Sequence, residues 1–197
     1  MRLFVAVNPP VEALQELSDA AAPLHGLSGA DRLRWSEPEG WHLTLAFLGE
    51  VPAADVPAME DRLERVASEH GAHRLRLAGA GCFGDRVLWV GLDGETWALR
   101  RLAEGVREAL EEAGAESDRH GFHPHLTLAR AGSSHGTPRA VRRLAAGELK
   151  LMAAALEGWQ GREWEAGELH LMHSDFGGYG PPRYTSLRSW PLARWEA

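Results

Sequence analysis

The segment His42-Leu43-Thr44-Leu45-Ala46 returns unchanged as His125-Leu126-Thr127-Leu128-Ala129 in the second half of the chain. Successive side chains along a β-strand point to opposite faces of the sheet. Each copy therefore places a histidine and a threonine on one face and two leucines on the other. We expect the leucines to be buried and the polar pair to face outward. The repeat predicts two similar halves that each contain one HLTLA strand.

Strand-like and helix-like stretches alternate around both copies. We expect strands at residues 3–7, within 33–49 on either side of a turn, in a hairpin formed by 73–84 and 86–92, and twice within 164–192 around a loop rich in Gly and Pro. Helices are predicted after Asn8, through Val56 to Gly71, over 96–114 and over 136–147. This order indicates an α+β fold on antiparallel or mixed sheets, whose two halves are lobes of one domain spanning residues 1–197.

The ends and buried faces of the helices can also be predicted. Asn8 is expected to cap the first helix, with Pro9 at its first position, and Thr137 to cap the fourth, with Pro138 at its first position. The pattern assigns no element to the interval after Gly147 and up to residue 162. Apolar residues at helical spacing are expected to be buried: Val11, Leu14 and Leu17 in the first helix, Val56, Met59, Leu63 and Val66 in the second, and Leu99, Leu102, Val106 and Leu110 in the third.

Composition and charge limit the classes of protein that fit. The chain of 197 residues carries 21 Lys and Arg against 28 Asp and Glu, a formal net charge of −7. This charge repels polyanions at long range, so any contact with nucleic acid must be local. Cys82 is the only cysteine, which excludes an intrachain disulfide and a cysteine-based metal site. The apolar start is too short for a signal peptide or a membrane span, so we expect a cytoplasmic protein with no membrane contact. We also expect a monomer.

The polar residues of the repeat suit phosphodiester chemistry. Two HLTLA strands that face each other across a groove would present two imidazoles on opposite sides of a bound group. In-line cleavage needs a base on the attacking oxygen and an acid on the leaving oxygen, and histidine can be either because its ordinary pKa is about 6.5. Thr44, Thr127 and Arg130 can donate hydrogen bonds to the non-bridging oxygens. From the residues alone, His42 and His125 are equivalent.

With its flanks, the repeated motif resembles the 2H phosphoesterase superfamily. The stretches MRLFVAV, WSEPEGWHLTLAFLGEV, GAGCFGDRVLWVGL, FHPHLTLAR and YTSLRSWPL are similar to the RNA 2′,3′-cyclic phosphodiesterases, also described as 2′-5′ RNA ligases. The resemblance implies a bilobed fold with outer helices around a central groove. It also implies hydrolysis of a 2′,3′-cyclic phosphate, on an RNA terminus or a nucleotide, to a 2′-phosphate without a metal or another cofactor, and a reverse reaction that forms a 2′-5′ linkage. By motif position, His42 corresponds to the family's proton donor and His125 to its proton acceptor. The segment 147–164 departs from the family pattern.

Other interpretations of the same residues stay open. A single HLTLA copy is typical of a half-buried strand with a solvated histidine. A metal site could use His120, His123 and His125, or His170 and His173, although HGFHPH and HLMH contain no carboxylate. A non-catalytic module could bind a nucleotide or phosphorylated RNA in the same groove. A related enzyme could act on another cyclic phosphate or on a 2′-5′-linked nucleotide.

Two further features bear on the site. Phe47 and Tyr184 lie near the motifs or in the last strand-like stretch and could stack on a base, as could Trp35 and Trp41. The string GAGCFG at 79–84 has the glycine spacing of a dinucleotide-binding loop. Such a loop must open a helix, whereas strand-like sequence follows here, so the string predicts a hairpin turn.

Overall fold

The computed structural model describes residues 1–84, 86–114, 121–131, 138–175 and 182–194, and of 138–146 the backbone alone. The strands are β1 (Arg2–Val7), β2 (Leu33–Trp35), β3 (Leu43–Glu50), β4 (His73–Phe83), β5 (Val87–Gly94), β6 (Leu126–Ala131), β7 (Trp164–Ala166), β8 (Glu168–Asp175) and β9 (Arg183–Pro191). The helices are α1 (Val11–Ala21), α2 (Val56–Glu69), α3 (Thr96–Glu112) and α4 (Pro138–Leu156). Short 3₁₀ helices lie at Ala22–Gly26, Ala30–Arg32 and Pro38–Gly40.

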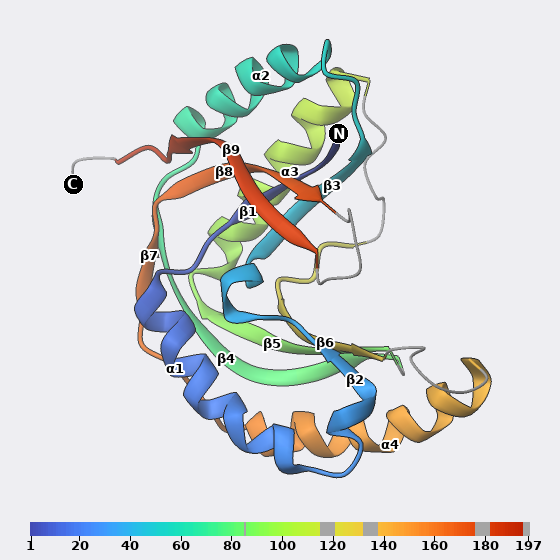
Figure 1. The fold of residues 1–197 in the computed structure, drawn as a ribbon. Coiled ribbons are helices and arrows are strands. Elements are labelled where there is room, and N and C mark those ends of the chain that lie inside the picture. Colours follow the sequence, from blue (N-terminus) through green and yellow to red (C-terminus); the bar gives the residue numbers. More distant parts are fainter. Residues whose placement is uncertain (85, 115–120, 132–137, 176–181, 195–197) are drawn as a thin grey trace.

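The strands form one curved sheet in the order β7-β4-β5-β6-β3-β1-β8-β9, and β2 pairs with β6 beside this path (Figure 1). In the described part of the chain, the ladders between these strands are antiparallel. The two HLTLA strands, β3 and β6, are neighbours in the middle of the sheet, and Leu43 pairs with Leu126. The predicted α+β fold is confirmed.

The helices divide the sheet into two lobes. Helices α2 and α3 pack on the half that contains β3, β8 and β9, whereas α1 and α4 pack on the half that contains β4 and β5 (Figure 1). Because β8 and β9 extend the sheet from β1, the last strands of the chain complete the lobe that the first strand began. The lobes are therefore interleaved along the sequence, and they meet at β3 and β6.

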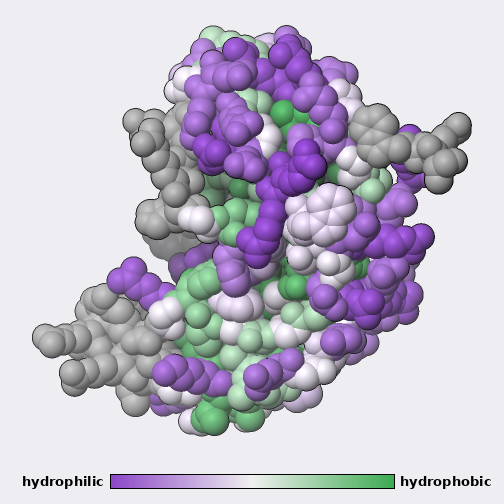
Figure 2. Space-filling view, turned by 180° about the vertical axis from the view of Figure 1, so that it is seen from behind, coloured by the Kyte–Doolittle hydropathy of each residue, from purple (hydrophilic) through white to green (hydrophobic). Residues whose placement is uncertain are grey.

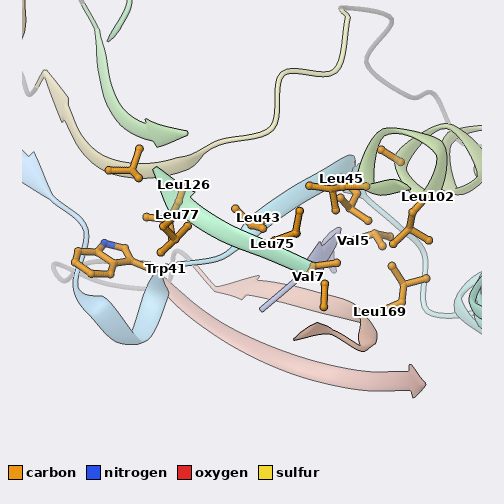
Figure 3. Packing of buried hydrophobic residues seen from close by; sticks show 14 of the residues in the cluster. Val5, Val7, Trp41, Leu43, Leu45, Leu75, Leu77, Leu102, Leu126 and Leu169 are labelled. Atoms are coloured by element: carbon orange, nitrogen blue, oxygen red, sulfur yellow. The ribbon is translucent and has the colours of Figure 1, made fainter. Parts of the chain in front are cut away.

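The leucines of both HLTLA copies are buried, as predicted. Leu43, Leu45, Leu126 and Leu128 are at most 7% exposed, and they belong to one apolar cluster that runs through both lobes (Figure 3). Burying a leucine side chain typically stabilises a fold by about 1.5–3 kcal/mol. The four leucines thus fix which face of each strand turns inward, and with it the direction of the histidines and threonines.

A β-bulge follows the threonine in both copies. Leu45 is an extra residue in β3 relative to β1, and Leu128 is an extra residue in β6 relative to β5. A bulge sets two residues against one on the partner strand and so re-aims the side chains that follow. Leu128 and Ala129 are accordingly both fully buried, and Arg130 is exposed on the face of Thr127. Strict alternation would have placed Arg130 on the face of the leucines.

The second and third helices bury the predicted residues. In α2 these are Val56, Met59, Leu63 and Val66, and in α3 they are Leu99, Leu102, Val106 and Leu110.

The hairpin predicted at 73–84 and 86–92 is formed by β4 and β5. Among the described helices, none combines the length and the apolar character that crossing a membrane requires.

The first helix begins later than the sequence predicts. Helix α1 starts at Val11, after Pro10, and no side chain caps it, so the predicted cap at Asn8 is wrong. The physical reason is the second proline, because a residue that precedes proline is pushed away from helical angles, and Pro9 cannot open a helix before Pro10. Val11 was expected to be buried but is 73% exposed.

The fourth helix ends later than predicted. It continues through Gly147 to Leu156, so the predicted end at Gly147 is wrong. Gly147 keeps a negative φ and so does not form the left-handed turn with which a glycine usually ends a helix. The buried residues of this added part are at helical spacing: Leu149, Met152, Ala153 and Leu156. Strand β7 then adds a third strand to the two predicted within 164–192. Thr137, the predicted cap of this helix, lies outside the described residues.

On one face of the molecule, the two lobes differ in surface character (Figure 2). Figure 2 shows hydrophilic residues over most of the lobe that carries α2 and α3, and more apolar residues over the lobe that carries α1 and α4. Large exposed apolar side chains occur on both lobes: Val11 on α1 and Leu151 on α4 are 73% and 68% exposed, and Trp97 on α3 is 62% exposed.

Candidate active site at the junction of the lobes

His42 and His125 occupy equivalent positions, each immediately before its strand. Nδ1 of His42 lies 2.7 Å from the carbonyl oxygen of Gly40, and Nδ1 of His125 lies 2.7 Å from the carbonyl oxygen of His123. A carbonyl oxygen only accepts hydrogen bonds, so the hydrogen of each neutral ring is on Nδ1. Nε2 of each ring is then the atom that can accept or donate a proton.

The Leu43–Leu126 pair brings the two motifs together. In an antiparallel ladder, the positions that flank a pair face each other across the strands. His42 therefore lies toward Thr127, and Thr44 lies toward His125. All four side chains are partly exposed on the face opposite the leucines. Two imidazoles and two hydroxyls thus lie on one face of two neighbouring strands.

Aromatic side chains pack around His42. The ring centroid of His42 lies 4.6 Å from that of Phe4 and 4.9 Å from that of Tyr184. Phe4 itself is buried in a small apolar cluster with Ala6 and Met172, beneath Tyr184. Because burial disfavours a charged ring, it lowers the pKa of His42 to about 4, and the positive charges of Arg130 and His125 contribute. At neutral pH the ring of His42 is therefore uncharged unless an anion lies beside it.

A second aromatic wall lies beside His125. Phe83 meets the ring of His125 edge-on at 4.7 Å, and Trp89 lies 4.8 Å from the ring of His123. Burial lowers the pKa of His125, the hydrogen bond to His123 opposes this effect, and the charges of His123 and Arg130 add to the lowering. Phe83 and Trp89 were not predicted as site residues, and His123 was considered only as a metal ligand. Alternation along 86–92 offered a signal, since Trp89 pairs with Thr127 and so lies on its face.

The glycines of GAGCFG allow the chain to pack against Trp89 and to turn beside His125. A β-carbon at Gly81 would overlap the indole of Trp89, its partner across β4 and β5. Gly79 and Gly84 adopt left-handed angles, at a register irregularity of β4 and at the turn before β5. The string therefore makes room for an aromatic ring and a turn. Strand β5 follows it, which confirms the predicted hairpin.

Phe47 and Tyr184, the predicted base-stacking residues, lie on the His42 side. Phe47 is 55% exposed, and its ring centroid lies 6.2 Å from that of Phe4. It follows the bulge of β3, as Arg130 follows the bulge of β6, so the two residues hold equivalent places in the repeat. Trp35 and Trp41 instead donate their indole N–H groups to backbone carbonyls at 2.9 and 3.0 Å.

The histidines considered for a metal site are placed differently from one another. The rings of His123 and His125 lie 6.2 Å apart, and His120 lies outside the described residues. Nδ1 of His170 lies 3.2 Å from the hydroxyl of Ser186, and its Nε2 lies 3.5 Å from the carboxylate of Glu168. Within the described ranges, no three His, Cys, Asp or Glu residues are arranged to hold a metal ion.

Known proteins resemble this chain in sequence and in fold. Residues 5–178 match the 2′-5′ RNA ligase superfamily. An RNA 2′,3′-cyclic phosphodiesterase from Geobacillus stearothermophilus is 36% identical over 153 residues, which are 73% of this chain and 46% of that protein. This chain thus spans less than half the length of that relative. Among solved structures, TT0787 of Thermus thermophilus has a TM-score of 0.76 and 30% identity, with all of both chains covered.

A second solved structure, Escherichia coli LigT in complex with 3′-AMP, has a TM-score of 0.76 and 28% identity over 98% of each chain. Other structures of LigT contain ATP or NADP+. The chain belongs to the 2′-5′ RNA ligase superfamily. The bilobed 2H phosphoesterase fold that the sequence resemblance implied is confirmed by these structures.

Proposed function

We propose that the chain hydrolyses 2′,3′-cyclic phosphates on RNA termini or nucleotides to 2′-phosphates, with His42 as proton donor and His125 as proton acceptor. The observation that carries the proposal is the pair of Nδ1-anchored rings on either side of the Leu43–Leu126 junction. The substrate class is supported by relatives that are named RNA 2′,3′-cyclic phosphodiesterases and by LigT structures that contain nucleotides.

The reaction divides into two proton transfers. Nε2 of His125 takes a proton from water as the water oxygen attacks phosphorus. The bond from phosphorus to O3′ breaks in line with the attack, and Nε2–H of His42 gives its proton to O3′. One water is consumed, and the products are a 2′-phosphate and a 3′-hydroxyl. Exchange with solvent restores the proton on His42 and removes the one on His125.

The anchoring of Nδ1 matters for both transfers. Because a backbone carbonyl holds Nδ1–H, each ring keeps its orientation in the neutral and charged forms. A bound anionic phosphate favours the charged form of a nearby imidazole, which offsets the burial that lowers the pKa of His42. The substrate thus raises the proton affinity of the donor when it binds.

Charge that develops on the non-bridging oxygens requires hydrogen-bond donors. We assign this role to the hydroxyls of Thr44 and Thr127 and to the guanidinium of Arg130. Arg130 is close enough to influence the pKa of both His42 and His125. A donor aimed at a developing negative charge in a partly buried site is typically worth about 10²–10³ in rate.

The walls of the site suit a nucleoside. Phe47 is exposed near Phe4, and Tyr184 lies against His42, so we assign these two rings to contact with the base or sugar of the terminal nucleotide. A 5′-hydroxyl that replaced the attacking water would form a 2′-5′ linkage by the same proton transfers. The cytoplasmic location, the monomeric state and the single domain over residues 1–197 stay predictions.

The deciding experiment is incubation with adenosine 2′,3′-cyclic phosphate in the presence of EDTA. We expect conversion to adenosine 2′-phosphate, identified by chromatography against the 3′ isomer. A 3′-phosphate product would reverse the leaving group and refute the geometry of attack. Loss of activity in EDTA with recovery on addition of a divalent ion would refute the metal-free mechanism. Tight binding without turnover would indicate a binding module.

A further inference from the structure

Arg34 lies directly opposite Arg130. The two residues are partners in the antiparallel ladder of β2 and β6. Cross-strand partners share a face of the sheet, with their β-carbons about 4.5–5.5 Å apart. Both side chains are exposed. Arg34 therefore projects on the side of the sheet that carries Thr127 and the histidine rings.

Other arginines of the protein have acidic partners. Arg32, Arg74 and Arg188 form ion pairs with Glu148, Glu163 and Glu60 at 3.4, 3.0 and 3.1 Å. Among the described residues, Arg34 and Arg130 have no such partner, and neither have Arg65 and Arg101; Arg34 and Arg130 are distinguished by being partners in a β-ladder. Like charges in direct register destabilise a sheet. A pair of this kind is stabilised when an anion binds between or beside the two guanidinium groups.

Both guanidinium groups are near the aromatic wall of His42. Burial raises the pKa of Tyr184, and the positive charges of Arg130, Arg2 and Arg34 oppose this effect. The charge of Arg130 also lowers the pKa of both histidines. Arg130 lies on β6, the strand that carries Thr127, whereas Arg34 lies on the neighbouring strand β2.

We propose that Arg34, beside Arg130, binds a second phosphate, the phosphodiester that joins the terminal nucleotide to the preceding one. The inference rests on the proposed function, since Arg130 is occupied by the cyclic phosphate. Neighbouring strands are about 4.8 Å apart. Successive phosphates of one nucleic-acid strand advance by about 3.4 Å along the axis of a double helix and lie further apart than this through space, a separation that two long arginine side chains on adjacent strands can span. A guanidinium one strand away is therefore placed for the next phosphate. The site then prefers an RNA terminus to a cyclic mononucleotide, through a local contact in a chain of net negative charge.

The test compares a cyclic mononucleotide with a dinucleotide. Kinetics are measured with adenosine 2′,3′-cyclic phosphate and with ApA that ends in a 2′,3′-cyclic phosphate. In Arg34→Gln, we expect the ratio of the two kcat/KM values, dinucleotide over mononucleotide, to fall by about tenfold or more, because hydrogen bonds to a charged group are among the stronger ones. Arg34→Lys keeps the charge but lacks the planar guanidinium group that can donate two parallel hydrogen bonds. The ratio should fall less in this variant than in Arg34→Gln. Arg32→Gln, which breaks the ion pair with Glu148, is the matched control and should leave the ratio as it is in the wild type.

Two results would overturn the inference. Equal losses on both substrates would make Arg34 a ligand of the reacting phosphate, and no loss on either would remove it from the site. Calorimetric binding of adenosine 2′-phosphate and of ApA 2′-phosphate separates this inference from the proposed hydrolysis. If the wild type turned over neither cyclic substrate but bound the dinucleotide product more tightly, and Arg34→Gln abolished that preference, the subsite would stand and the proposed activity would fail.

Discussion

Leu43 and Leu126, the equivalent leucines of the two HLTLA copies, are partners in the ladder between β3 and β6. When equivalent residues face each other in an antiparallel ladder, a local twofold axis passes between them. Features around the axis are accordingly duplicated: each histidine donates Nδ1–H to the carbonyl two residues earlier, and each strand bulges after its threonine. One short sequence that occurs twice thus places two equivalent histidines about a twofold axis, the arrangement on which the proposed acid and base depend.

The first prediction separates chemistry from folding at both histidines. His42→Asn and His125→Asn keep a side-chain N–H that can reach the carbonyl oxygen of Gly40 or His123, but they remove Nε2. We expect each variant to lose about 10²–10⁴ in kcat, the range for a general acid or base. The midpoint of thermal unfolding should stay close to that of the wild type.

His70→Asn is a matched control, because His70 also directs Nδ1 at a backbone carbonyl, that of Val66, but lies at the end of α2. It should keep wild-type turnover. If His125→Asn were inactive while His42→Asn turned over normally, only one copy of the repeat would be catalytic, and the two-histidine mechanism would be refuted.

The second prediction concerns the hydroxyls. Thr44→Val and Thr127→Val keep the branched shape that suits a strand and remove the donor. Each should reduce kcat by about 10²–10³, with little change in stability because both side chains are partly exposed. Steady-state kinetics on a cyclic nucleotide provide the measurement. Near-normal turnover in both variants would leave Arg130 as the only donor and would remove the threonines from the mechanism.

The directions of the side chains in the two HLTLA strands could be predicted from the sequence. Alternation within HLTLA indicated buried leucines and outward histidines, and burial of Leu43 and Leu126 agrees. Helical spacing likewise identified the buried faces of α2 and α3. The roles of His42 and His125 stay predictions until the variants are measured. These successes share a cause, since period and polarity are local properties of the chain.

Features that depend on contacts between distant segments could not be predicted in this way. The bulge at Leu128, which turns Arg130 toward the site, is defined by the register with β5. The pairing of Arg34 with Arg130 requires β2 to join β6 instead of β3. Phe83 reaches His125 only because the β4–β5 hairpin curves beside β6.

The third prediction tests stacking on the exposed ring of Phe47. Phe47→Ala removes a ring that is 55% exposed, so stability should change little. Stacking of a base on an aromatic side chain is typically worth about 1–3 kcal/mol. We expect a rise in KM for cyclic nucleotides with a smaller change in kcat. Trp97→Ala removes another exposed ring, on α3, and should leave KM unaltered; an equal rise in both variants would point to a general effect on the fold.

The fourth prediction concerns the space beside Gly81 that the indole ring of Trp89 occupies. In Gly81→Ala, the added methyl would overlap the indole ring, so the ring or the strand must move. Overpacking of this kind typically costs about 1–3 kcal/mol, measurable as a fall in the urea midpoint. Activity should fall as well, because Trp89 supports Phe83 and His123 beside His125. Gly158→Ala, where a β-carbon meets open space, is the control, and unchanged stability in Gly81→Ala would show that the wall adapts.

The last prediction is the pH dependence, and it follows from the direction of the pKa shifts. The active form carries one proton on the histidine pair, so kcat/KM falls when that proton is lost at higher pH and when a second is added at lower pH. Burial lowers the pKa of both rings from about 6.5, that of His42 to about 4. The pH at which kcat/KM is highest should therefore lie below the ordinary histidine pKa of about 6.5. The alkaline limb of kcat should lie at higher pH, because a bound phosphate anion favours the charged rings.

Arg130 provides the check on this assignment. Its positive charge lowers the pKa of both histidines, so Arg130→Gln should raise both pKa values even as it slows the reaction. The alkaline limb of kcat/KM then moves to higher pH, because the single proton is held more tightly. Arg130→Lys preserves the charge and should leave the limb near its wild-type position while losing the two-pronged contact to phosphate. A limb that stayed fixed in Arg130→Gln would mean that the guanidinium does not act on the pair, and the pH profile would have to be assigned to other groups.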